Sequence, residues 1–152
     1  MVSQTVEYAL RAMSHLASLQ GRSATSEVLA QATLVPHAYL SKIMRDLVCA
    51  DLVKSFRGRR GGFLLAREPR EISLLDIVNA VEPIRRIQRC PLGNPLHVTL
   101  CSLHQCLDDV LAHAEHLLAR TTLDTVLDES CRPGMCRSLV GQKPLTQPGV
   151  AP

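Results

Sequence analysis

The sequence predicts a mainly helical fold that contains a small β-hairpin and a long helix towards its C-terminal end. Apolar residues recur at helical spacing through most of the chain, residues 52–66 instead suggest two short strands around a glycine-rich turn, and residues 103–121 follow a heptad-like pattern. The chain has 152 residues, of which 46% are apolar and 3% aromatic, with no Trp. This is enough to bury a core, which must be largely aliphatic.

Three helices are expected before the hairpin, at about residues 3–19, 25–31 and 36–50. The first has apolar residues at helical spacing and a glycine just past its end. Ser23 or Thr25 is available as the N-cap of the second. The third opens with a proline, a good first helical position. The buried stripe of this third helix is expected to be Leu40, Ile43, Met44 and Leu47.

The stretch LVKSF-RGRRG-GFLLA reads as a hairpin whose turn is rich in glycine and arginine. A further helix is expected over residues 72–82 with Ser73 as its cap, then a long helix over residues 103–120 and a short one over residues 121–129. Steps of four and three residues along the long helix form a heptad-like seam, which we interpret as a dimer interface. The alternative is packing on its own domain. The seam consists of Leu103, Leu107, Val110, Ala114, Leu117 and Thr121.

Three helices followed by a basic hairpin predict a winged helix-turn-helix. We expect this DNA-binding domain to cover residues 1–82, and a cysteine-containing loop to cover residues 83–102. Residues 103–131 would then form the dimerisation helix and the short final helix. Residues 132–152 are rich in proline and glycine without periodicity, so we expect a disordered tail.

Basic residues concentrate in the middle of the chain. Between His37 and Arg70 there are eight Lys or Arg residues and three acidic ones, so this segment has a net charge of +5. The whole chain has a net charge of only +3, so the remaining residues together carry −2. Such a patch against a slightly acidic remainder is typical of a nucleic-acid-binding surface, although a solvated basic face has the same composition.

The third helix and the turn of the hairpin supply the candidate DNA contacts. A major groove admits one helix, and arginines on a wing can reach phosphates or the narrow minor groove. We therefore expect double-stranded DNA as a partner. The candidate residues on the helix are His37, Tyr39, Ser41, Lys42 and Arg45, and those on the wing are Arg57, Gly58, Arg59 and Arg60.

Three stretches, VEYALRAMSHLA, PHAYLSKIMRDLVCADLVKSFRGRRGGFLLARE and ISLLDIVNAVE, resemble the bacterial winged-helix regulators that include IscR and NsrR. The resemblance covers residues 2–131, and its motifs are Tyr8–Arg11, Pro36–Leu40 and Arg57–Gly62. Asp51 stands where relatives have glycine, and we expect Cys49, in the same turn, to be a structural and partly buried thiol.

The resemblance implies a homodimeric transcription factor that binds a palindrome-like operator. Some members of that family respond to iron–sulfur status, nitric oxide or redox state through a bound cluster, and others carry none. In cluster-binding members three cysteines precede the long helix, and the IscR type adds a histidine in a Cys-x-x-His arrangement. The pair Arg59 and Arg60 adds charge where the family commonly has proline and glycine.

The loop of this chain matches that cysteine pattern in part. Cys90 matches the first cysteine, while Cys101 and His104, within CSLH, match the last cysteine and the histidine. The middle cysteine is absent, and Cys106 is an additional thiol. These four residues are the candidate metal ligands. Less favoured are His97, and Glu7, which stands where some relatives use an aspartate as a ligand from the first helix of the partner.

Several interpretations of the loop stay open. Mixed cysteine and histidine ligation favours a 2Fe–2S over a 4Fe–4S cluster. The alternatives are a thiol redox switch, a zinc site, or no cofactor at all, with cysteines that only pack. We expect Cys131 and Cys136 in the tail to be incidental.

An enzyme is not expected, because no paired carboxylates, phosphate-binding glycine loop or nucleophile elbow is visible. The chain also shows neither a signal peptide nor a run of about 20 apolar residues. We therefore expect a cytoplasmic protein without a membrane partner, whose thiols remain reduced.

Overall fold

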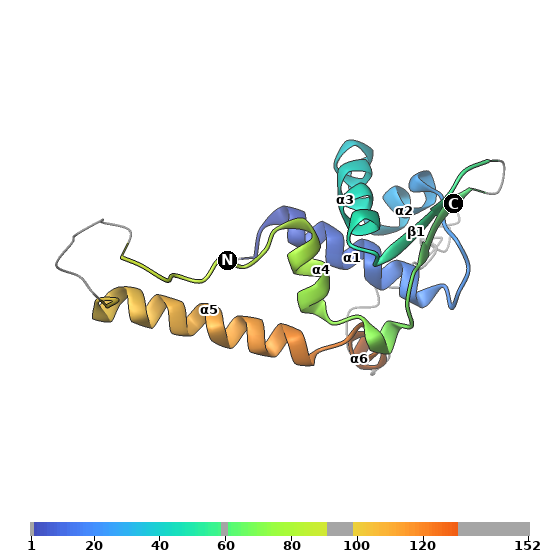
Figure 1. The fold of residues 1–152 in the computed structure, drawn as a ribbon. Coiled ribbons are helices and arrows are strands. Elements are labelled where there is room, and N and C mark those ends of the chain that lie inside the picture. The colour runs from blue at the N-terminus through green and yellow to red at the C-terminus, as the bar shows by residue number, and fades with distance from the viewer. Residues whose placement is uncertain (1, 59–60, 91–98, 131–152) are drawn as a thin grey trace, which may run out of the picture.

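The computed structural model describes residues 2–58, 61–90 and 99–130 (Figure 1). A two-stranded antiparallel sheet accompanies the helices, and the predicted fold class is confirmed. The elements, in chain order, are α1 (Gln4–Ser18), α2 (Ser26–Thr33), α3 (His37–Cys49), β1 (Val53–Phe56), β2 (Gly62–Leu65), the 3₁₀ turn η1 (Pro69–Glu71), α4 (Leu74–Val81), α5 (Ser102–Arg120) and α6 (Leu123–Ser130).

Side-chain caps define where most of the early helices begin. The Ser3 hydroxyl accepts from the backbone N–H of the third residue of α1, and Thr25 rather than Ser23 does the same for α2. Ser73 caps α4 in a reciprocal capping box with Asp76. The start of α3 differs by one residue from the prediction, because Pro36 has extended backbone angles and serves as the N-cap.

Helix α1 is the centre of the core. It packs against α2, α3, α4, α6 and strand β2. Two of its residues on the buried side, Ala9 and Ala12, have small side chains and are fully buried, so neighbouring elements approach the helix closely. The predicted stripe of α3 is fully buried against the same core. The orientation of α3 therefore depends on α1.

The base of the hairpin is fastened to the loop before α2. Val53 pairs with Leu65 and Phe56 with Gly62 in the sheet, and Phe63 exchanges two backbone hydrogen bonds with Ala24, of 2.8 and 3.0 Å. A Cβ atom at Gly62 would lie 2.6 Å from the Ala24 carbonyl oxygen. The close approach of these two backbones therefore requires glycine at this position.

The N-terminal part of helix α5 extends past the compact part of the molecule, and the helix then runs towards α6, which lies beside that compact part (Figure 1). Leu123, at the start of α6, is fully buried in the same core as α1. Four residues of the heptad-like seam, Leu103, Leu107, Val110 and Leu117, are 47–65% exposed, so these four side chains are largely uncovered by their own domain. Among the described helices, none combines the length and apolarity needed to cross a bilayer.

His15 is a buried polar side chain in this core. It is 6% exposed. Its Nδ1 atom has no hydrogen-bond partner, and burial lowers the pKa of its imidazole below the ordinary value of 6.5. The folded state therefore favours neutral His15.

The free energy of unfolding should consequently depend on His15 in mildly acidic solution. Below pH 6.5 the unfolded chain takes up a proton at this histidine that the folded chain resists. Stability should therefore decrease as the pH falls from 6.5 towards the lowered pKa of the folded state. Urea unfolding between pH 8 and pH 5 tests this, and His15→Gln should flatten the dependence. An equally steep decrease in His15→Gln would assign the effect to other groups.

Candidate functional site

The outer face of α3 presents the side chains that the sequence proposed for DNA contact. His37, Tyr39, Ser41, Lys42 and Arg45 are all exposed, because the buried stripe occupies the opposite side of the helix. The Ser41 hydroxyl donates to the His37 carbonyl oxygen at 3.0 Å, which satisfies its donor within the helix. The two cations, Lys42 and Arg45, project into solvent.

A contact from α1 supports one member of this face. The ring of Tyr39, 58% exposed, meets the ring of Tyr8 edge-on, with centroids 6.2 Å apart. Gln4, one turn earlier on α1, donates from Nε2 to the Tyr8 hydroxyl at 2.8 Å. The sequence analysis included Tyr8 only as part of a motif and missed Gln4. The four-residue spacing of these two residues was the available signal.

The root of the wing is exposed and tightly turned. Arg57 and Gly58 follow β1 directly and are exposed, whereas Arg59 and Arg60 lie outside the described residues. Gly58 has φ of +106°, and the Gly61 N–H donates to its carbonyl oxygen at 2.8 Å. The glycines thus permit a turn that places Arg57 at the end of the hairpin.

The turn after α3 corrects one expectation. Cys49 was expected to be partly buried and is exposed, because it lies at the end of α3 away from the buried stripe. Asp51 has φ of +55°, a left-handed conformation that glycine adopts without strain and that aspartate tolerates. The backbone conformation of Asp51 is therefore one that suits the glycine found at this position in the regulators that the chain resembles.

A cysteine–histidine site forms where α5 begins. We use this name for Cys90, Cys101 and His104. The sulfur of Cys101, the N-cap residue of α5, lies 3.2 Å from His104 Nδ1. The sulfur of Cys90 approaches the same nitrogen at 3.9 Å. Both thiols are half-buried. One imidazole nitrogen thus contacts two sulfurs from separate segments of the chain.

The remaining candidate ligands are not gathered at this site. Cys106 is exposed two residues beyond His104, and residues two apart on a helix do not face the same way. His97 lies outside the described residues. Within the described ranges, no group of three or more His, Cys, Asp or Glu side chains is arranged to hold a metal ion. The donor types nevertheless fit a thiolate-binding metal or cluster.

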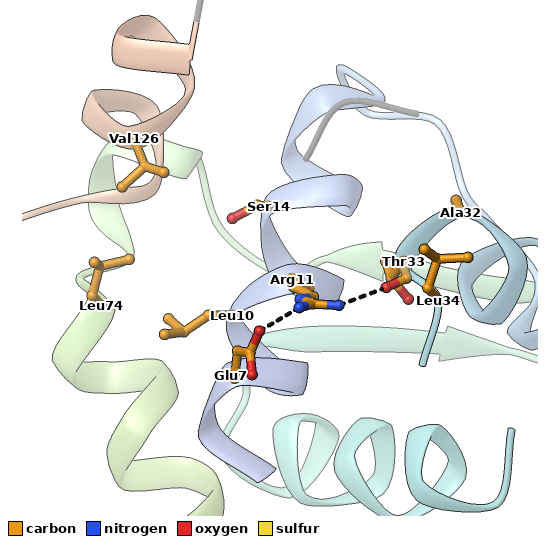
Figure 2. Close-up of a pocket in the computed structure, with 9 residues that line it drawn as sticks. All are labelled: Glu7, Leu10, Arg11, Ser14, Ala32, Thr33, Leu34, Leu74 and Val126. Carbon is orange, nitrogen blue, oxygen red and sulfur yellow. Dashed lines mark hydrogen bonds and ion pairs between the residues drawn. The ribbon is translucent and has the colours of Figure 1, made fainter. Parts of the chain in front are cut away.

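Glu7 lies beside a pocket between α1, α2, α4 and α6 (Figure 2). Its carboxylate pairs with the Arg11 guanidinium, which also donates to the Thr33 carbonyl oxygen at 3.4 Å. The pocket has a volume of about 520 Å³ and apolar walls that include Leu10 and Val126. Within one chain, the carboxylate of Glu7 is therefore the ion-pair partner of Arg11.

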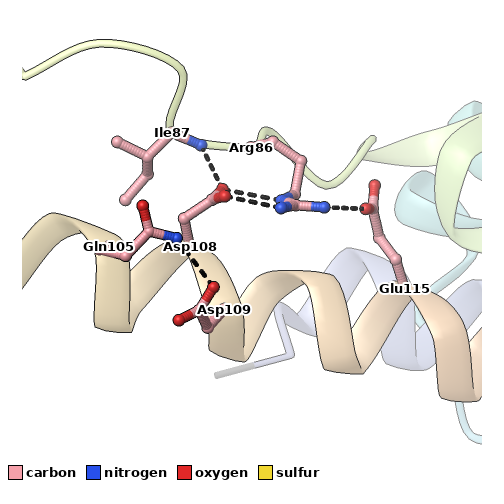
Figure 3. Close-up of polar contacts among 6 residues, drawn as sticks. All are labelled: Arg86, Ile87, Gln105, Asp108, Asp109 and Glu115. Atoms are coloured by element: carbon pink, nitrogen blue, oxygen red, sulfur yellow. Dashed lines mark hydrogen bonds and ion pairs between the residues drawn. The ribbon is translucent and has the colours of Figure 1, made fainter. Parts of the chain in front are cut away.

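A polar cluster on α5 was missed by the sequence analysis (Figure 3). Asp108 accepts from Arg86 Nε at 2.7 Å, from Arg86 Nη2 at 2.6 Å and from the Ile87 backbone N–H at 2.8 Å. Arg86 Nη1 also donates to Glu115 at 3.2 Å. The hydrogen bond from Arg86 holds the pKa of Asp108 below its ordinary value, and the two carboxylates raise the pKa of Arg86.

A comparison with protein-family models matches residues 2–129 to Rrf2, described as an iron-dependent transcriptional regulator. Among curated proteins, the HTH-type transcriptional regulator NsrR of Geobacillus kaustophilus is 31% identical over 127 residues. That match covers 81% of this chain and 86% of the relative.

Solved structures with the same fold include IscR of T. potens, 28% identical with a TM-score of 0.71, covering 90% of this chain and 92% of that one. CymR, the global cysteine regulator of B. subtilis, is 26% identical with a TM-score of 0.69, covering 85% and 97% of the two chains. Staphylococcus aureus CymR, in a structure described as its oxidized form, is 25% identical with a TM-score of 0.65, covering 83% and 94%.

Replacing Arg57 at the root of the wing tests whether this surface meets DNA. If Arg57 contacts one phosphate, Arg57→Ala should weaken binding and reduce the slope of log K against log salt by about 0.9. Fluorescence anisotropy with a DNA duplex across a salt series measures both quantities. Arg120→Ala, at the end of α5, removes the same charge outside the basic face and should leave the slope unchanged. An unaltered slope in Arg57→Ala would place this arginine outside the interface.

Proposed function

The chain belongs to the Rrf2 family of transcriptional regulators, and from this premise we propose that it binds a palindrome-like operator as a homodimer and senses iron–sulfur, redox or nitric oxide status through its cysteine–histidine site. The chain is accordingly a transcriptional regulator and not an enzyme. The three parts of the proposal rest on different observations.

The DNA-binding part rests on the exposed face of α3 and the wing. A recognition helix needs one face that packs firmly on its domain and an opposite polar face that is free to enter the groove. Helix α3 has both faces. Its buried stripe fastens it to α1, while Lys42 and Arg45 lie exposed on the other side. Arg57 adds positive charge at the root of the wing. We propose that these three cations contact phosphates or bases, and that Arg59 and Arg60, which lie outside the described residues, add their charge to the DNA contact.

The homodimer part rests on the unpaired seam of α5. Four large apolar side chains with heptad-like spacing are about half exposed or more, on a helix that extends past the compact body. A second copy of α5 would remove this apolar surface from water, which is the usual driving force of coiled-coil pairing. A homodimer also suits an operator with two related half-sites.

The sensing part rests on one observation, the approach of both Cys90 and Cys101 to His104 Nδ1. These residues would supply two thiolates and one imidazole to a cluster, and His97 or Cys106 remain candidates for a further ligand. Mixed cysteine and histidine donors favour a 2Fe–2S over a 4Fe–4S cluster. Such a cluster would make the site responsive to electrons, oxygen and nitric oxide. The protein's own part is to bring together two segments that are otherwise separate.

A thiol switch without metal is the second candidate, favoured by the same contact. The sulfurs of Cys90 and Cys101 both lie near one imidazole nitrogen, and a thiolate is the form of cysteine that an oxidant attacks. The similarity to Staphylococcus aureus CymR, known in an oxidized form, is consistent with such chemistry. A zinc site and a cofactor-free regulator are the remaining alternatives. Metal analysis distinguishes the cluster and the zinc site from the two metal-free candidates, and reaction with peroxide separates those two.

Purification without oxygen should therefore yield a coloured protein that contains iron and acid-labile sulfide. Cys101→Ala should lose the colour, the iron and the sulfide, because it removes the sulfur nearest His104. Cys49→Ala is a matched control, since it deletes an exposed thiol at the end of α3. Iron, sulfide and absorbance assays on the three proteins provide the measurement.

A colourless, iron-free wild-type protein would contradict the cluster. If the iron-free protein contained zinc, a zinc site would replace the cluster as the explanation of the cysteine–histidine site. If it contained no metal and lost DNA affinity on reaction with peroxide, the thiol switch would replace it. A protein that contained no metal and kept its DNA affinity after reaction with peroxide would be the cofactor-free regulator.

A further inference from the structure

We propose that Asp108 is a positioning residue for the cysteine–histidine site, because it fastens the segment that carries Cys90 to the face of α5 that carries His104. We call residues 82–90 the strap. It joins the end of α4 to Cys90 and runs alongside α5 (Figure 1). The proposal rests on the proposed function insofar as the site is a sensor, but the positioning itself can be tested separately.

The strap has little else to hold it. None of its residues belongs to a helix or strand, and most of their side chains are exposed. Only Ile84, Ile87 and Cys90 are half-buried. Without regular hydrogen bonding and with little apolar burial, this segment should sample many conformations unless polar contacts restrain it. Asp108 provides such contacts in the middle of the strap.

The contacts of Asp108 restrain both the side chain and the backbone of the strap (Figure 3). Its carboxylate receives two N–H groups from Arg86, a bidentate arrangement that fixes direction as well as distance. It also receives the Ile87 backbone N–H. Asp108 is 8% exposed, so its acceptors face the strap with limited competition from water. Glu115 holds the remaining arm of the guanidinium.

The spacing on α5 sets the register of the strap against the site. His104 and Asp108 are four residues apart and lie on the same face, one turn from each other. The strap runs antiparallel to α5, so that Arg86 and Ile87 meet Asp108 before Cys90 meets His104. Three residues of extended chain reach about 10 Å, which easily spans one helical turn of about 5.4 Å. Fixing Ile87 therefore limits how far Cys90 can move from His104.

The other end of the strap reaches the DNA-binding domain. Glu82, its first residue, accepts a hydrogen bond from the hydroxyl of Ser3, the N-cap of α1. Helix α1 in turn carries Tyr8, which contacts Tyr39 on the exposed face of α3. A change at the cysteine–histidine site that displaces Cys90 would therefore pull on a segment bound at one end to α5 and at the other to α1. The contacts of Asp108 determine how firmly the strap is held against α5.

Asp108→Asn tests the proposal, with Asp109→Asn as a matched control. Asp109 is the next residue along α5, and its replacement by Asn removes the same charge. Its carboxylate is exposed and accepts a hydrogen bond from Gln105 rather than from the strap (Figure 3). The full chain is kept reduced and free of oxygen. Amide hydrogen exchange at Ile87 and the rate of alkylation at Cys90 are measured by mass spectrometry or nuclear magnetic resonance.

In Asp108→Asn, exchange at Ile87 and alkylation at Cys90 should each accelerate about tenfold, the factor that the loss of one charge-assisted hydrogen bond produces. Alkylation at Cys49, an exposed thiol at the end of α3, should be unchanged. Arg86→Gln should reproduce both effects from the opposite side of the contact, and because it lies outside α5 it cannot act by weakening that helix. If both variants behaved like Asp109→Asn, Asp108 would not position Cys90.

Titration with cobalt(II) alone connects this result to the site. The wild-type protein should develop absorption from sulfur-to-cobalt charge transfer, and Asp108→Asn should show about half of it, because Cys101 remains beside His104 while Cys90 is released. A full-strength spectrum in Asp108→Asn would overturn the proposal. If the wild type itself took up neither cobalt nor iron, the metal or cluster site would be ruled out, while faster exchange and alkylation in Asp108→Asn would still establish the positioning role.

Discussion

The burial of α1 is the constraint on which the rest of the structure depends. Five other elements pack against this helix, and two alanines on its inner side allow them to approach closely. Helix α3 has no side-chain cap of its own, so its orientation comes from the stripe that it buries in the same core. Because α6 returns to this core through Leu123, the C-terminal end of α5 is fastened as well. A displacement of α1 would therefore reach the exposed face of α3, the base of the wing and the heptad-like seam of α5 together.

The cysteine–histidine site lies at the opposite end of α5 from this core, and it is assembled by polar contacts instead of apolar burial. Such contacts suit a sensor. An ion pair near the surface contributes little net stability, because desolvation offsets much of the attraction, yet it specifies one geometry. The strap is thus held by Ser3, Asp108 and His104 in turn, each through a few atoms. A chemical change at the last of these contacts can alter the segment without unfolding the core.

Much of the fold could be predicted from the sequence, because its signals are local. Helical periodicity identified the buried stripe of α3, hydroxyl residues marked the starts of α2 and α4, and glycines marked the wing. The site was predictable only in part. The motif CSLH placed Cys101 beside His104, and the resemblance added Cys90. The pairing of Arg86 with Asp108 could not be foreseen, since two polar residues 22 positions apart leave no periodic signal. The exposure of Cys49 and the burial of His15 likewise depend on which face of a helix the tertiary structure covers.

We propose that the state of the cysteine–histidine site and the affinity for DNA are coupled through the strap and α1. The most direct test of this coupling is the dissociation constant for DNA of one oxygen-free preparation, measured before and after its metal or cluster is removed, with a duplex that the protein itself has selected from a random pool. We expect the dissociation constant to change by about 5-fold to 150-fold, the usual range for coupling between two sites, and the measurement gives the direction. Equal dissociation constants for the loaded and the stripped protein would contradict the coupling.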